Sequence, residues 1–277
     1  MKITIMTRVY WKCYTAKSLN VSLYPIIRRV AASGYDAIDF CEHVDEFWPL
    51  GLTQDDRKTI RDLLNSVGLE VSSLTTPTAW PLPAGITVLS QLKRSIEIAS
   101  YFGAKVVMCG SAPKGEEEWR KTVDLYQEVG SHAEDHGIDI AIEFMNIGYP
   151  TTESILKFLD EVGIENVGVC LEVENVNARP KNEPLKDHMT KVKEKIKLIH
   201  LVDPTNEEMH KKMNINVSEV VETVKKFGFD GYLVNEAITR QIPYEKLDAE
   251  VCRSAKFLKN IITKSSHSNI SQKKACI

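Results

Sequence analysis

The chain has 277 residues, of which 43% are hydrophobic and 26% charged, and its formal net charge is −3 at pH 7. This composition excludes a disordered chain, because the apolar fraction is high and the charges are balanced. With 35 basic residues against 38 acidic ones, the sequence has no basic excess for nucleic acid or anionic lipid, and we expect neither as a partner. The longest uncharged run, residues 71–92, holds three prolines, so we expect no membrane span.

The six cysteines form no Cys-x-x-Cys pair. Cys41, Cys109 and Cys170 end apolar runs, where a free thiol behaves as a small apolar residue. Residues 1–10 alternate like a first strand and do not resemble a signal peptide. We therefore predict a reduced, cytoplasmic protein without disulfides.

A unit of helix, glycine and short apolar run recurs along the chain. Its glycine junctions are Gly34, Gly68, Gly103, Gly137, Gly163 and Gly228. Successive glycines lie 34, 35, 34, 26 and 65 residues apart, so the last interval holds two units, with a junction lacking glycine near residues 193–195. Glycine just past a helix adopts the left-handed conformation without Cβ strain. Each unit is therefore predicted to be helix, glycine turn and strand.

Eight strands are predicted, and several are continuous apolar runs typical of strands buried on both faces. They lie near Lys2–Met6, Ala37–Phe40, Glu70–Leu74, Lys105–Cys109, Asp139–Glu143, Val167–Leu171, Lys197–His200 and Tyr232–Asn235. Helical spacing between them predicts a parallel (β/α)8 TIM barrel over residues 1–262. The polar residues 263–277 are expected to form a disordered tail.

An open doubly wound sheet is the alternative architecture. No Gly-x-Gly-x-x-Gly follows the first predicted strand, and no Gly-x-x-x-x-Gly-Lys-Ser/Thr occurs. A Gly-x-Ser-x-Gly elbow is also absent, which excludes the usual serine hydrolase nucleophile. The barrel remains the better interpretation.

Four consecutive strand ends carry residues that can bind a metal ion. In a TIM barrel the chemistry lies at the carboxyl ends of the strands. Strands five to eight end in Glu143, Glu172, His200 and Glu236. Converging carboxylates repel one another unless a cation lies among them, although each residue alone could be an ordinary ion-paired acid or core histidine. Three carboxylates and one imidazole predict one divalent ion, Mn²⁺, Mg²⁺ or Co²⁺.

Such a site suggests proton transfer beside a metal-bound carbonyl. A divalent ion polarises the carbonyl of a sugar-like substrate and stabilises the charge left when the neighbouring proton departs. Glu143 and Glu236 come from non-adjacent strands, so one can remove the proton and the other return it. Asp203 is expected to orient His200 or bind a substrate hydroxyl, unless it is an exposed loop acid.

Further candidates for substrate binding follow other strands. Asn146 follows Glu143 at its strand end, and His43 lies in a polar run after the second strand that is alternatively a plain loop. Trp11 and Trp80, with Trp48, lie in loops after the first three strands. They are expected either to form an apolar wall of the pocket or to pack on the barrel rim.

The chain resembles the sugar phosphate isomerase/epimerase family with the xylose isomerase-like TIM barrel. The resemblance spans residues 1–262 and rests on five segments, GYDAIDF, IAIEFMN, NVGVCLEVEN, IKLIHLVD and GFDGYLVNEA. It implies one divalent ion held by Glu143, Glu172, His200 and Glu236, a small sugar or polyol as substrate, and the homo-oligomers that are common in the family.

The sequence departs from the family pattern around the expected substrate. Strand six usually shows Leu-Asp-x-x-His, whereas here Glu172 takes the ligand position. Asn175 replaces the histidine, which is often a substrate contact in the family, and is therefore expected to bind substrate. Tyr149 and Asn206 stand where ketose 3-epimerases carry a glutamate and an arginine. The ion site is kept and the ketohexose contacts are not, which favours family chemistry on another substrate.

Three functions therefore remain open. The leading hypothesis is a divalent-metal-dependent isomerase or epimerase of a sugar or sugar-like polyol. A dehydratase or lyase of a keto-sugar or keto-inositol could use the same site. A catalytically inactive barrel that acts as a binding protein is the third, suggested by the changes at Glu172 and Asn175.

Overall fold

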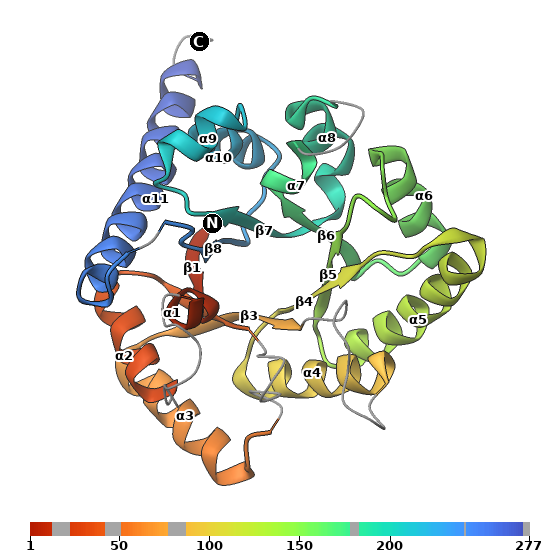
Figure 1. The fold of residues 1–277 in the computed structure, drawn as a ribbon, viewed down its shortest axis with the longest axis horizontal. Coiled ribbons are helices and arrows are strands. Elements are labelled where there is room, and N and C mark those ends of the chain that lie inside the picture. Colours follow the sequence, from red (N-terminus) through yellow and green to blue (C-terminus); the bar gives the residue numbers. More distant parts are fainter. Residues whose placement is uncertain (13–22, 42–50, 77–86, 178–182, 241, 274–277) are drawn as a thin grey trace.

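The computed structural model is a closed barrel of eight parallel strands ringed by helices (Figure 1). It describes residues 1–12, 23–41, 51–76, 87–177, 183–240 and 242–273. The strands are β1 (Lys2–Met6), β2 (Ala37–Cys41), β3 (Glu70–Thr76), β4 (Val106–Ser111), β5 (Asp139–Phe144), β6 (Val167–Glu172), β7 (Ile196–Val202) and β8 (Tyr232–Ala237). Each strand pairs with the next in sequence, and β8 pairs with β1. The predicted (β/α)8 barrel is confirmed.

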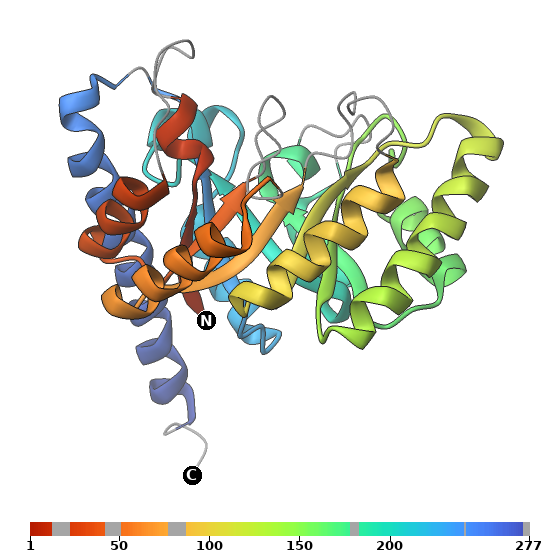
Figure 2. The ribbon, with the colours of Figure 1, turned by 90° about the horizontal axis from the view of Figure 1, so that it is seen from below.

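The helices divide into long ones outside the barrel and short ones at the carboxyl ends of strands. The long helices are α2 (Leu23–Ser33), α3 (Gln54–Val67), α4 (Val88–Phe102), α5 (Gly115–Asp135), α6 (Thr152–Val162), α8 (Leu185–Val192), α10 (Val217–Lys226) and α11 (Tyr244–Lys273). The short helices α1 (Arg8–Lys12), α7 (Val173–Asn177) and α9 (Glu207–Lys212) follow β1, β6 and β7. Figure 2 shows α1, in red, at the end of the barrel where β1 ends. None of the described helices has the length and apolarity that a membrane span requires.

The predicted glycine turns link these helices to the strands. All six glycines adopt positive φ angles, between 64° and 91°. At Gly68, which ends α3, the amide hydrogen-bonds back to the carbonyls of Asn65 and Leu64, the geometry of a left-handed helix cap. The junction without glycine is instead a short 3-10 turn, Lys193–Lys195.

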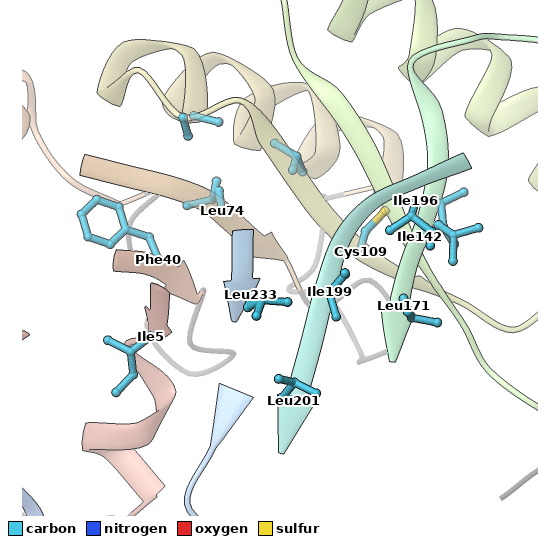
Figure 3. Packing of buried hydrophobic residues seen from close by; sticks show 14 of the residues in the cluster. Ile5, Phe40, Leu74, Cys109, Ile142, Leu171, Ile196, Ile199, Leu201 and Leu233 are labelled. Carbon is cyan, nitrogen blue, oxygen red and sulfur yellow. The ribbon is translucent and has the colours of Figure 1, made fainter. Parts of the chain in front are cut away.

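The strand side chains alternate between two apolar layers. Outward side chains pack against the helices, and Figure 3 shows such residues from every strand, among them Ile5, Leu171 and Leu233. Inward side chains form a smaller cluster inside the barrel: Met6, Cys41, Val106, Met108, Ala141, Cys170, Leu198 and Val234. Because side chains alternate along a strand, the residue two positions beyond each inward member also faces inward. This alternation positions the site described below.

The end of the chain differs from the prediction. Helix α11 runs from Tyr244 to Lys273, past residue 262, where we expected irregular chain to begin. Its apolar stripe, Leu247, Val251, Ala255 and Leu258, is buried as predicted. No glycine or proline follows within the helix, so no residue breaks the hydrogen-bond ladder after the stripe ends. The polar segment is therefore helical to Lys273.

Candidate active site

Four predicted ligands converge inside the barrel at the carboxyl ends of β5 to β8. Glu143, Glu172, His200 and Glu236 each lie two residues beyond a member of the inner cluster and so face inward. Glu172 pairs with His200 in the register of β6 and β7. The Nδ1 atom of His200 lies 3.2 Å from Oε2 of Glu172 and 4.0 Å from Oε2 of Glu236. Strand alternation and barrel closure thus bring together residues far apart in sequence.

The carboxylates repel one another in this buried setting. Burial raises the pKa of Glu172 well above its usual range, and the charges of Glu236 and Glu143 add to that shift. Burial also raises the pKa of Glu143, together with the charge of Glu236. A hydrogen bond from Asn175 and the charge of Arg8 oppose the Glu143 shift. The cluster therefore lacks a positive charge sufficient to offset the repulsion among its carboxylates.

His200 has the properties of a metal ligand. Its side chain is fully buried, and neither ring nitrogen has a hydrogen-bond partner among the described residues. Burial lowers its pKa to about 4, so the imidazole is neutral near pH 7 and a nitrogen lone pair is available. The ligand atoms of His200, Glu172 and the buried Cys170 lie within 4.8 Å of one another. An unpartnered neutral imidazole among repelling carboxylates fits a divalent cation.

Asn175 and Asn146, both predicted to bind substrate, lie around Glu143. The Asn175 side chain on α7 donates to Oε1 of Glu143 over 2.7 Å. The Asn146 side chain in turn donates to the backbone carbonyl of Asn175 over 3.1 Å. This pair of contacts holds the Glu143 carboxylate against the end of β6, and substrate binding by the two asparagines stays a prediction.

Arg8 is part of the site, although it was not among the predicted residues. It is the first residue of α1, and its Nη1 donates to Oε1 of Glu236 over 3.0 Å. The same charge lowers the pKa values of Glu143 and His200. An arginine directly after the first strand was the available sequence signal, because that position belongs to the functional rim.

Asp39 on β2 is a further acid of the barrel interior. It is fully buried, and its Oδ2 accepts hydrogen bonds from the hydroxyls of Ser73 and Thr75. Its Oδ1 has no partner in the described part of the chain. Burial raises the pKa of Asp39 to about 7, and the charge of Glu236 adds to this rise. The hydrogen bonds from Ser73 and Thr75 act in the opposite direction.

Asp203 is not the exposed loop acid that the sequence allowed. It is fully buried with a φ of 43°, and Arg240 donates to both of its oxygens, over 2.7 Å and 3.0 Å. The backbone amide and hydroxyl of Thr239 and the side-chain amide of Asn206 also donate to Oδ2. These bonds tie the end of β7 to the segment after β8. The described contacts of Asp203 include neither His200 nor any other predicted ligand.

Replacing Arg240 by glutamine is expected to lower the free energy of unfolding by about 2–3 kcal/mol, because a buried carboxylate loses its charged partner. Burial alone would raise the pKa of Asp203, but the hydrogen bonds and charge of Arg240 bring it below the usual value. The stabilisation is therefore complete above about pH 4 and is lost as the pH falls through the lowered pKa. Urea unfolding at pH 7 and at lower pH measures both effects.

The matched control for this prediction is Arg94→Gln, which removes an exposed ion pair with Glu97 on one helix. We expect that change to stay within about 0.5 kcal/mol. Equal stability of the Arg240 variant and wild type at pH 7 would contradict the structural role given to Asp203.

Three predicted substrate contacts lie outside the described part of the chain, and two residues that depart from the family pattern have structural partners. His43 and Trp80 lie outside the described residues, as does the Trp11 side chain on α1. Tyr149 is buried against Trp119, Phe144 and Phe158, and its hydroxyl bonds Ser111. Asn206 caps α9 and donates to Asp203. The last two residues therefore serve packing and local hydrogen bonding.

Comparison with known proteins supports the architecture. A sequence model of the xylose isomerase-like TIM barrel family matches residues 27–261. No curated protein matches the chain by sequence. A D-psicose 3-epimerase from Clostridium cellulolyticum H10, solved with D-tagatose, has a TM-score of 0.75 at 15% identity, over 95% of this chain and 99% of its own.

Two further solved structures are similar. A D-allulose 3-epimerase from Methylomonas sp. in complex with D-allulose has a TM-score of 0.72 at 17% identity, covering 94% of this chain and 96% of its own. A xylose isomerase-like TIM barrel protein from Mycobacterium smegmatis in complex with magnesium has a TM-score of 0.73 at 17% identity, covering 95% and 97%. At such identities the likeness establishes the fold.

Proposed function

The chain belongs to the xylose isomerase-like TIM barrel family, and we propose that it is a divalent-metal-dependent isomerase or epimerase of a sugar or sugar-like polyol. The observation that carries this proposal is His200, a fully buried, neutral imidazole without a hydrogen-bond partner in the described chain, beside Glu172 and Glu236. Structural relatives include sugar 3-epimerases and a magnesium complex, which supports the same choice.

Glu143, Glu172, His200 and Glu236 would hold the ion. A bound divalent cation would polarise a substrate carbonyl and offset the charge that forms when an adjacent proton leaves. The carboxylate-rich donor set suits Mn²⁺, Mg²⁺ or Co²⁺. Because the charge of Glu236 raises the pKa of both Glu143 and Glu172, a cation would also relieve the repulsion among the carboxylates.

Glu143 and Glu236 are assigned the proton transfers. They lie on β5 and β8, with β6 and β7 between them in the barrel order, so they approach a substrate over the site from different sides. Asn175 orients Glu143 through one carboxylate oxygen, and Arg8 orients Glu236 through one carboxylate oxygen. One residue removes the proton next to the carbonyl, and the other returns it.

The protein is proposed to act in the cytoplasm on a small molecule. Cys41, Cys109, Cys170 and Cys252, the cysteines of the described residues, form no disulfide. Free thiols are typical of a reducing compartment.

Solvent exchange tests the proposed reaction. The manganese-loaded protein would be incubated in D₂O with a panel of ketoses, their acids and phosphates, and keto-inositols, and the products followed by NMR. We expect deuterium at one carbon with the molecular formula retained. Loss of water would identify elimination and contradict the isomerase assignment. Absence of exchange on every substrate would indicate a binding protein instead.

A further inference from the structure

Arg8 lies where it can contact the substrate as well as Glu236. Its side chain is 37% exposed, and Nη1 bonds Oε1 of Glu236 at the rim of the barrel. We propose that Arg8 binds an anionic group, carboxylate or phosphate, of the substrate, so that the enzyme acts on a charged sugar derivative and not on a neutral sugar. This inference rests on the proposed function and specifies its substrate class.

The guanidinium of Arg8 has N–H donors beyond the one that bonds Glu236. An arginine carries five N–H donors in a planar fork, which matches the two oxygens of a carboxylate or phosphate. In the described part of the chain, Nη1 of Arg8 has one hydrogen-bond partner, the Oε1 atom of Glu236. The remaining donors and the exposed part of the side chain can therefore bind a second oxyanion beside the glutamate.

Arg8 is also held in place before any substrate arrives. The preceding residue, Thr7, is fully buried, and its amide donates to the carbonyl of Asp39 over 2.9 Å. The Thr7 hydroxyl accepts from the amide of Cys41 over 2.9 Å, so both bonds fasten the start of α1 to β2. A donor group on a fixed backbone loses less conformational freedom when it binds a ligand.

The charges of the site permit an anion once a divalent cation is bound. Glu143, Glu172 and Glu236 bring three negative charges when ionised, and a divalent ion would leave one of them uncompensated. Arg8, whose charge acts on both Glu143 and His200, compensates that remaining charge. An anionic group approaching Arg8 would then meet no net repulsion.

Three probes with one carbon skeleton test the inference. D-fructose is neutral, 2-keto-D-gluconate carries a carboxylate in place of the first hydroxymethyl group, and D-fructose 6-phosphate carries its anion at the far end. Their affinities for the manganese-loaded protein would be measured by calorimetry with wild type, Arg8→Gln and Arg8→Lys. The matched control is Arg29→Gln, since Arg29 pairs with Asp248 between α2 and α11, outside the barrel.

We expect wild type and the Arg29 variant to bind at least one anion about 10- to 100-fold more tightly than fructose, as suits a charge-assisted hydrogen bond. The anion that binds more tightly than fructose identifies carboxylate or phosphate as the group that Arg8 recognises. Arg8→Gln should remove the preference, measured as the ratio of anion affinity to fructose affinity, and Arg8→Lys should restore part of it.

Two results would overturn the assignment of Arg8: equal binding of the three probes by wild type, or a preference for an anion that persists in Arg8→Gln. Failure of all three probes to bind the manganese-loaded wild type would instead count against the proposed function itself.

Discussion

Replacing Glu143 by glutamine is expected to lower kcat by about 10²- to 10⁴-fold, the range that a positioned acid or base contributes. Glutamine has the same size as glutamate, and its amide oxygen can still accept the hydrogen bond that Asn175 donates to Oε1 of Glu143 over 2.7 Å in the wild type. It cannot accept the substrate proton. The measurement is the rate of deuterium exchange at saturating manganese, with circular dichroism to establish that the variant is folded.

The control is Glu117→Gln on α5, which removes an exposed glutamate that pairs with Lys121 on the same helix. Its kcat should equal that of wild type. Glu236→Gln should reproduce the loss seen at Glu143, because both carboxylates are needed for a complete proton transfer. Wild-type rates in both site variants would refute the roles assigned to them.

Replacing His200 by glutamine is expected to weaken manganese binding by about 100-fold or more, since loss of even a supporting contact at a metal site costs about 10- to 100-fold. His200 has no hydrogen-bond partner among the described residues, so no protein hydrogen bond offsets the burial of its ring nitrogens. Titration calorimetry with Mn²⁺ measures the affinity of each variant directly.

His132 on α5 provides a matched control, because its Nε2 is also buried without a described partner, away from the carboxylates. His132→Gln should bind manganese as wild type does. If His200→Gln retained wild-type affinity, the imidazole would be an ordinary core residue.

The barrel could be predicted because each unit carries its own local signals. A glycine such as Gly103 ends a helix, and an apolar run such as Val106–Cys109 follows it. The positions of the strand ends were predicted less accurately, because backbone pairing continues beyond the apolar run. Strand β7, predicted over Lys197–His200, extends to Val202. The short helix α7 was not predicted, because five residues carry no periodicity.

The convergence of the four proposed ligands could also be predicted, because strand alternation decides which side chains enter the barrel. Glu236 faces inward, whereas its neighbour Asn235 bonds the hydroxyl of Tyr35. The partners of single polar residues could not be predicted in the same way. Asp203 bonds Arg240, 37 positions further along the chain, and Arg8 bonds Glu236, 228 positions away. Such contacts depend on barrel closure and on loop geometry that no local pattern encodes.

The central claim is that one divalent ion lies among Glu143, Glu172, His200 and Glu236. Anomalous diffraction near the manganese absorption edge, from crystals grown with Mn²⁺, tests it most directly. We predict one strong anomalous peak per chain, about 2–2.5 Å from carboxylate oxygens of this cluster and from a ring nitrogen of His200. Absence of an anomalous peak among these four residues, or a peak only elsewhere on the chain, would contradict the account.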